Sequence, residues 1–163
     1  MSKSLARVRA ALETAGVPAH ILEMAESTRT APEAAAAAGC ELDQIVKSIV
    51  FRGAETGEVL LFLTAGGNLV CNERAGELAG ETLERADAAL VRARTGFAIG
   101  GVAPVGHLAP VRAWLDPRLM DFSEVWAAAG TPRHIFAIDP ARLPGLTGAI
   151  PAGFTLPGRG AGP

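Results

Sequence analysis

The sequence predicts an α+β fold with a mixed β-sheet in a single domain. Helical and strand patterns alternate irregularly along the chain and include hairpins, which favours a mixed sheet over a doubly wound parallel one. The 163 residues are 49% hydrophobic and 20% charged, as in an ordinary globular domain. A chain of this length buries enough apolar surface to fold without disulfides. We expect one domain over residues 1–153 and a flexible tail over 154–163, where glycine and proline are frequent.

The first part of the chain predicts two helices around an extended segment. A helix capped by Ser4 is expected over 4–15, because apolar side chains recur there at helical spacing and a glycine follows. An extended stretch should follow at 20–24. Thr30 and Glu33 have the spacing of a capping box, so a second helix is expected to begin there and to run through the alanines that follow.

The centre of the chain predicts a β-hairpin. Residues 45–52 are rich in β-branched side chains, residues 55–57 favour a turn, and residues 58–64 are expected to form the return strand. Three short elements should follow the hairpin: a helix at 73–79, a strand at 83–85 and a helix at 88–94.

The last third of the chain predicts further strands. We expect strands over 111–115 and 133–138, and a last short helix opened by the pair Asp139-Pro140. The segment 123–129 is ambiguous, because its alanines favour a helix whereas its position suggests a strand.

Charge and hydropathy limit the classes of partner. The net charge of −2 argues against a general nucleic-acid coat. Residues 1–84 carry 7 basic and 12 acidic side chains, whereas residues 85–142 carry 7 basic and 5 acidic ones. The second part can therefore contact phosphates locally, with weak and salt-sensitive binding overall. No apolar run approaches the length of a bilayer-spanning helix, so we expect no membrane partner.

The cysteines and the first residues favour a cytoplasmic protein. Cys40 and Cys71 have neither metal-type nor redox-type spacing, and the sequence begins with an amphipathic pattern instead of a signal peptide. We therefore expect two reduced thiols in a cytoplasmic protein.

Lys47 is the first candidate functional residue. It falls within a predicted strand whose two faces are both largely apolar, and a buried ammonium is costly unless it is paired or meets a ligand. The chain has 13 arginines and only 2 lysines, so a lysine here suggests a need for a compact point charge. The alternative is that Lys47 lies near a strand end and reaches water.

A loop rich in glycine over residues 96–107 is the second candidate. Successive glycines let backbone N–H groups converge on an anion or an oxyanion. The loop lacks the Gly-Lys-Ser/Thr ending of a P-loop and does not open a helix with a dinucleotide-binding motif. A plain connector between two elements is the alternative. His107, at the end of this loop, could contact a ligand.

The sequence offers neither a metal site nor an obvious nucleophile. The three histidines lack metal-ligand spacing, and no cluster of His, Cys, Asp and Glu is evident, so we expect no metal or other cofactor. Ser48 is the one hydroxyl beside a possible base. A dyad of Ser48 with Lys47 is not expected, however, because neighbouring strand residues point to opposite faces.

Two segments resemble the YbaK/ProX family, whose members are free-standing relatives of the editing domain of bacterial prolyl-tRNA synthetase. They are residues 44–51 (QIVKSIVF) and residues 95–107 (TGFAIGGVAPVGH), and the late segment 126–130 (WAAAG) is also similar. The resemblance covers about residues 5–153. It implies a mixed sheet curled toward a barrel and flanked by helices, without a metal. It also implies a trans-editing deacylase that hydrolyses the ester of a small wrong amino acid on a tRNA, commonly proline tRNA.

The resemblance also implies a set of site residues. Lys47 would lie in the editing pocket, and the loop would supply backbone N–H groups that stabilise an oxyanion while a water attacks the ester, assisted by the vicinal ribose hydroxyl. The expected catalytic residues are Lys47, Gly100 and Gly101. The expected substrate-binding residues are Thr30, Ala103, Pro104, Val105, Gly106, His107 and Gly130. The expected partner is the acceptor end of an aminoacyl-tRNA, with prolyl-tRNA synthetase as a further candidate.

Some positions depart from the family pattern. Ala128 replaces a serine found in many relatives, Ala103 stands where serine is frequent, and Asn68 closes a segment that is usually Gly-Asp-Arg-like. These changes suggest a subgroup with a different substrate preference. Two alternatives also stay open. One is a non-catalytic module that binds the tRNA end, a synthetase or a small aminoacyl ligand, which the missing serine and the acidic net charge favour; the other is a hydrolase of small esters or thioesters. The amino acid removed, the tRNA and the oligomeric state also stay open.

Overall fold

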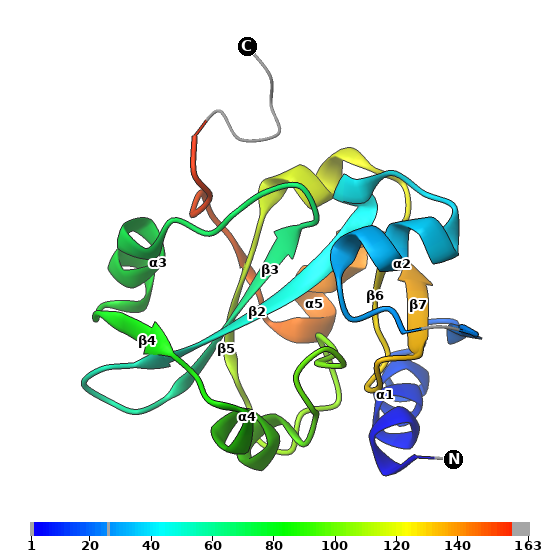
Figure 1. The fold of residues 1–163 in the computed structure, drawn as a ribbon, viewed down its shortest axis with the longest axis horizontal. Coiled ribbons are helices and arrows are strands. Elements are labelled where there is room, and N and C mark those ends of the chain that lie inside the picture. The colour runs from blue at the N-terminus through cyan, green and yellow to red at the C-terminus, as the bar shows by residue number, and fades with distance from the viewer. Residues whose placement is uncertain (1, 26, 158–163) are drawn as a thin grey trace.

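The computed structural model describes residues 2–25 and 27–157 (Figure 1). Within these residues eight strands form one mixed sheet in the order β1-β7-β6-β2-β3-β5-β8, with β4 paired to the far end of β2. The strands are β1 (His20–Glu23), β2 (Ile45–Gly53), β3 (Val59–Ala65), β4 (Leu83–Arg85), β5 (Arg112–Leu115), β6 (Val125–Ala128), β7 (His134–Ile138) and β8 (Ile150–Pro151). The α-helices are α1 (Lys3–Thr14), α2 (Ala31–Ala38), α3 (Asn72–Ala79), α4 (Ala88–Thr95) and α5 (Leu143–Thr147).

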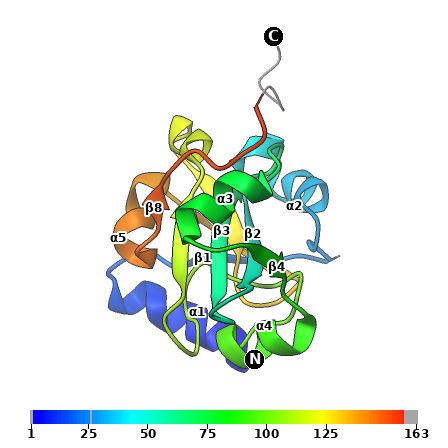
Figure 2. The same cartoon turned by 90° about the vertical axis from the view of Figure 1, so that its left-hand side faces the viewer.

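The pairing directions confirm the mixed sheet of a single α+β domain. The hairpin β2–β3 is antiparallel, as are β1–β7, β6–β7 and β2–β4. The pairs β2–β6, β3–β5 and β5–β8 are parallel. Among the described residues the end strands β1 and β8 do not pair with each other, so the curled sheet is not closed. Figure 2 shows α3 across β2 and β3, with α1 and α4 at one end of the molecule.

Local sequence signals explain the helix boundaries. The capping box before α2 forms as predicted: Glu33 N–H donates to Thr30 Oγ1 at 3.3 Å, and Thr30 N–H donates to Glu33 Oε1 at 3.1 Å. For α1 the predicted cap was wrong. Ser2 accepts the N–H of Leu5 at 3.0 Å, whereas Ser4 lies inside the helix and donates to the Gly96 carbonyl at 3.4 Å.

Tertiary pairing resolves the ambiguous segment in favour of a strand. Residues 125–128 form β6 between β7 and β2, in spite of the helix propensity of alanine. Val125 and Ala127 point into the core from one face and are buried.

The folded part of the chain extends beyond the predicted boundary at residue 153. Phe154 is fully buried and packs edge-on against Phe62, at 5.0 Å between ring centroids, and Phe62 stacks on Trp114 at 4.8 Å. Thr155 forms a β-bridge with Val70. A single aromatic side chain therefore holds the start of the expected tail on the sheet, and residues 158–163 lie outside the described residues.

Two further expectations concern membranes and thiols. No α-helix in residues 2–25 or 27–157 is long and apolar enough to cross a bilayer. Cys40 and Cys71 are both free thiols. Burial, together with the nearby carboxylates of Glu124 and Glu41, raises the pKa of Cys40, which disfavours the reactive thiolate.

Candidate functional site

A pocket of about 490 Å³ opens where β2 and β6 diverge. These parallel strands pair only at Ile45–Trp126 and at Val46–Ala127. Beyond this point the gap between the strands is bordered by the residues that precede and begin α2, and by the glycine loop. The pocket is lined by residues 28–32, Ala34, residues 45–49, Gly66, Ile99, Gly100, Val102, residues 126–128 and Ile135.

The pocket brings together three of the residues predicted for the site. Thr30, Lys47 and Gly100 all line it, although they are far apart in the sequence. Thr30 comes from the cap of α2, Lys47 from the middle of β2, and Gly100 from the glycine loop. The spacing between these segments is set by the sheet, because α2 packs on β2 through Ile45.

Gly101 and Gly130 have packing roles outside this pocket. A Cβ on Gly101 would lie 2.8 Å from the carbonyl carbon of Thr131, and the Gly101 N–H donates to the Ala98 carbonyl at 3.0 Å. Gly130 has φ +98°, and a Cβ there would lie 2.8 Å from the Ser4 carbonyl oxygen. Both positions require glycine because backbones approach closely there.

The rest of the predicted loop residues lie elsewhere. Ala103 is fully buried in the main core. Pro104, Val105, Gly106 and His107 line a second cavity of about 630 Å³ beside α1 and α5. The predicted binding segment is therefore divided: Gly100 and Val102 border the first pocket, and the part from Pro104 onward borders the second.

His107 and Arg7 hold the second part of the loop in place. The Nε2 of His107 lies 2.7 Å from the Ala103 carbonyl oxygen, and burial lowers the pKa of His107, as does the nearby Arg7. Arg7, on α1, donates from Nη2 to the Gly96 carbonyl at 2.8 Å and from Nε to the Gly106 carbonyl at 3.1 Å. Its guanidinium also lies 5.0 Å from the centre of the Phe97 ring.

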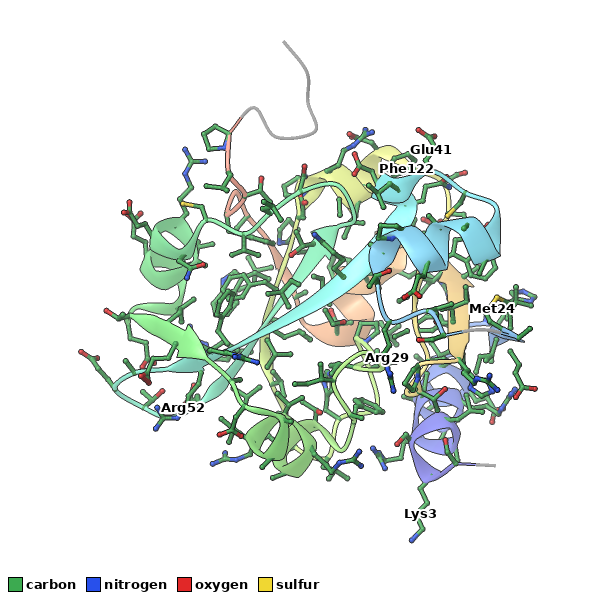
Figure 3. All side chains as sticks on the ribbon, in the orientation of Figure 1. Lys3, Met24, Arg29, Glu41, Arg52 and Phe122 are labelled. Atoms are coloured by element: carbon green, nitrogen blue, oxygen red, sulfur yellow. The ribbon has the colours of Figure 1, made fainter. Side chains whose placement is uncertain are left out.

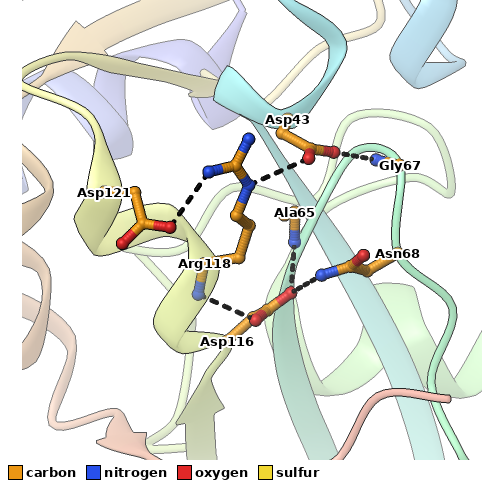
Figure 4. Close-up of polar contacts among 7 residues, drawn as sticks. All are labelled: Asp43, Ala65, Gly67, Asn68, Asp116, Arg118 and Asp121. Carbon is orange, nitrogen blue, oxygen red and sulfur yellow. Dashed lines mark hydrogen bonds and ion pairs between the residues drawn. The ribbon is translucent and has the colours of Figure 1, made fainter. Parts of the chain in front are cut away.

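Lys47 is fixed by the turn that follows β3. Its Nζ donates to the Asn68 carbonyl at 2.5 Å. Asn68 is held in turn by Asp116, whose Oδ2 accepts from the Asn68 Nδ2 at 2.9 Å and from the Ala65 N–H at 3.1 Å (Figure 4). Asp116 is only 3% exposed, and its other oxygen accepts the Arg118 N–H at 3.0 Å. The ammonium of Lys47 is therefore oriented by a hydrogen-bonded chain that leads to a buried carboxylate.

A second carboxylate fixes the same turn from the other side. Asp43 accepts the Gly67 N–H at 2.7 Å and pairs with the Arg118 Nε at 3.0 Å (Figure 4). Arg118 also pairs with Asp121, and hydrogen bonds to these two carboxylates raise the pKa of the guanidinium. A Cβ on Gly66 would collide with the Leu42 carbonyl oxygen. Residues 66–68, which depart from the family pattern, therefore form a tightly packed turn.

Arg29 is a pocket residue that sequence reasoning missed. The Arg29 side chain is exposed and lies against Gly100 (Figure 3). A Cβ added to Gly100 would be 2.7 Å from the Arg29 Cγ. Its position directly before the capping box could have indicated it. Among the described lining residues, Lys47 and Arg29 are the charged ones and no carboxylate is present. The pocket therefore favours a ligand that is anionic or that develops negative charge.

The described residues contain no group of three or more His, Cys, Asp or Glu side chains placed to hold a metal ion. Two further lining residues, Ser48 and Trp126, were not expected in the site. They border the gap between β2 and β6, whose position depends on strand order and is not encoded by any local motif.

Comparison with known proteins agrees with this geometry. The profile of the aminoacyl-tRNA editing domain matches residues 25–146. The uncharacterized protein YwhH of Bacillus subtilis (strain 168) is 31% identical over 123 residues, which cover 76% of this chain and 78% of YwhH.

Solved structures show the same fold over nearly the full length. A candidate trans-editing enzyme for prolyl tRNA synthetase is 49% identical, with a TM-score of 0.88 over 96% of this chain and 99% of that chain. The hypothetical protein APE2540 is 28% identical, with a TM-score of 0.84 over 92% of this chain and 99% of that chain. The chain belongs to the aminoacyl-tRNA editing domain family, as its resemblance to the YbaK/ProX proteins predicts.

Proposed function

We propose that the protein is a trans-editing deacylase, which hydrolyses the ester between a small wrong amino acid and a tRNA, with proline tRNA as the expected carrier. One observation supports this most: the pocket of an editing-domain fold gathers Thr30, Lys47 and Gly100 around a space whose described lining residues include two cations and no carboxylate. The ligand would be the acceptor end of an aminoacyl-tRNA, and the protein would act in the cytoplasm, where translation takes place. Prolyl-tRNA synthetase is a further candidate partner.

The proposed mechanism needs no protein nucleophile. An aminoacyl ester is already activated, so a water can attack the carbonyl while the vicinal ribose hydroxyl assists the proton transfer. Backbone N–H groups of the loop would stabilise the oxyanion, and one such donor contributes about 2.7–4 kcal/mol to lowering the barrier. Because the Gly101 N–H is used by Ala98, Gly100 and Val102 are the better candidates for this role.

Lys47 would orient the ester or the terminal adenosine as a fixed positive charge. Its Nζ donates to the Asn68 carbonyl, and an ammonium donates a stronger hydrogen bond to a neutral acceptor than a neutral amine does. A general base would need the neutral amine. The geometry therefore favours binding and orientation over proton abstraction.

A deacylation assay tests this proposal. Purified protein is mixed with a panel of proline tRNAs charged with cysteine, alanine, serine, threonine or 2-aminobutyrate, and ester loss is followed over time. We expect hydrolysis of at least one member and a loss of activity in Lys47→Ala. Absence of hydrolysis across the panel would refute the function, and unchanged turnover in Lys47→Ala would refute the role of this lysine.

A non-catalytic binding module is the second candidate. Ala128 lines the pocket at the position where many relatives have serine, so a hydroxyl that could act on the substrate is missing there. This function predicts that the protein binds an uncleavable aminoacyl-adenosine analogue while leaving every charged tRNA intact. Hydrolysis in the assay above would exclude it.

A further inference from the structure

One edge of β2 is unoccupied where the strand passes the pocket. β3 pairs with one edge of β2 from Val46 to Arg52. On the other edge, β6 pairs only at the start of β2 and β4 only from Phe51 onward (Figure 1). Within the described chain, residues 47–50 therefore have no strand on this edge, and residues 47–49 form part of the pocket wall.

Ser48 is one of these residues, and its hydroxyl has no partner among the described residues. Its Oγ is buried and makes no hydrogen bond to any of them. The other two hydroxyls of the described pocket wall are bonded within the protein: Thr28 Oγ1 donates to the Pro132 carbonyl at 2.9 Å, and Thr30 Oγ1 lies 3.0 Å from a Glu33 carboxylate oxygen. A buried hydroxyl without a partner is unfavourable and needs an explanation. Since Ser48 also lines the pocket, a polar group of a ligand is a candidate partner.

The surroundings of Ser48 fit a small side chain. Apart from Ser48 and Lys47, the side chains that β2, β6 and the glycine loop contribute to the wall are apolar: Ile45, Val46, Ile49, Ile99, Val102, Trp126, Ala127 and Ala128. Strand neighbours alternate, so Val46 shares a face of β2 with Ser48, whereas Ile45, Lys47 and Ile49 lie on the opposite face. Ala127 pairs with Val46 in register and therefore lies on the Ser48 face as well. A ligand group that reaches Ser48 would meet one hydroxyl beside these two apolar side chains.

We propose that Ser48 selects the substrate, by hydrogen bonding to a hydroxyl in the side chain of the aminoacyl group. This inference rests on the proposed editing function and names its substrate class: seryl and threonyl esters. Two hydroxyls can each serve as donor or acceptor, so one hydrogen bond gives each of them a partner. An apolar side chain of the same size leaves the Ser48 hydroxyl unpaired and is disfavoured. A thiol is a weaker donor, so cysteinyl esters should rank between the two.

The test compares two nearly isosteric substrates on the same proline tRNA, seryl and 2-aminobutyryl. For the wild-type protein we expect kcat/KM to favour seryl by about tenfold, the equivalent of one net hydrogen bond. Ser48→Ala should bring the ratio to about one, because the seryl side chain loses its hydrogen-bond partner. The control Thr28→Val removes a hydroxyl that is already bonded, and it should leave the ratio unchanged.

Other outcomes overturn the inference. An equal loss on both substrates would show that Ser48 contacts a part common to them, and an unchanged ratio would show that it contacts neither side chain. Ser48→Ala should also keep or raise the free energy of unfolding, because it removes an unpaired hydroxyl. A clear decrease would mean that the hydroxyl is bonded inside the protein and is not available to a ligand.

A binding measurement separates this inference from the proposed function. The probes are adenosines that carry a seryl or a 2-aminobutyryl group in a 3′-amide linkage, which cannot be hydrolysed as an ester. If the wild-type protein deacylates no charged tRNA but binds the seryl probe about tenfold more tightly in a Ser48-dependent way, the function fails and the inference stands. If it deacylates tRNA without any such preference, the function stands and the inference fails.

Discussion

Asp116→Ala should lower the free energy of unfolding by about 1–3 kcal/mol, because it leaves a buried donor without an acceptor. This donor is the N–H of Ala65, a fully buried residue. The other two donors, the Asn68 Nδ2 and the Arg118 N–H, belong to residues that are partly open to water, so their loss should add little. Asp116→Asn keeps one oxygen acceptor and should cost less than alanine.

Urea unfolding followed by circular dichroism measures this effect. The urea midpoint should fall while the m-value stays constant, because unfolding exposes the same amount of surface in the wild-type protein and in Asp116→Ala. Asp121→Ala is the matched control, because this carboxylate pairs with Arg118 but is 60% exposed, and its loss should cost below about 1 kcal/mol. Equal effects of the two alanine variants would refute the assignment of Asp116 as the buried centre of the network.

Asp116 should also affect activity through Lys47. Without Asp116 the Asn68 side chain is no longer held, and the carbonyl that orients the Lys47 ammonium can move. In the deacylation assay kcat/KM should fall at least about tenfold, which corresponds to ~1.4 kcal/mol. In a Lys47→Ala background the same change should have little further effect. Additive effects of Asp116→Ala and Lys47→Ala on kcat/KM would show that Asp116 does not act through Lys47.

Three further predictions concern the loop and the pocket rim. Gly101→Ala should reduce both deacylation activity and the free energy of unfolding, because the new Cβ would lie within 3 Å of the Thr131 backbone. The deacylation assay and urea unfolding measure these two effects. Gly145→Ala is the control, because a Cβ there meets nothing within 4 Å. Arg29→Ala should weaken tRNA binding and reduce the slope of log Kd against log salt by about 0.7–0.9, which is the contribution of one phosphate contact. Filter binding at several salt concentrations measures this slope. An unchanged slope would show that Arg29 does not contact a phosphate. Since burial lowers the pKa of His107 below its ordinary value of 6.5, the unfolded chain takes up the proton first as pH falls. Stability should therefore decrease as the pH drops below about 6.5, and it should decrease less steeply in His107→Gln when both proteins are unfolded in urea between pH 7.5 and 5.

Local signals in the sequence predicted most of the elements. The capping box at Thr30 fixed the start of α2, and the β-branched run around Lys47 fixed β2. Segment 125–128 stayed ambiguous because its pairing with β7 and with β2, which is far away in the sequence, makes it a strand. Phe154 was missed because the glycines and prolines around it suggest a tail, whereas its burial depends on Phe62 and Trp114.

The candidate site was predictable only in part. The family resemblance indicated Lys47, Thr30 and Gly100, and the pocket contains all three. Asp116, which holds the Asn68 side chain and so the turn that binds Lys47, could not be predicted. It and Ala65, whose N–H it accepts, are 51 positions apart, and no motif links them. The division of the glycine loop between two cavities likewise depends on how α1 packs, through contacts of Arg7 that span 89 and 99 positions.

The contacts of Arg7 have a consequence for the order in which the molecule can assemble. Helix α1 leaves the ribosome before the segments that hold it, because its partners at Gly96 and Gly106 are synthesised about 90 and 100 residues later. Until then the apolar face of α1, with Leu5, Val8 and Leu12, has only part of its core to cover. The pocket is complete later still, since its wall includes Trp126 and Ile135. A nascent chain that ends before these residues should have no complete binding pocket.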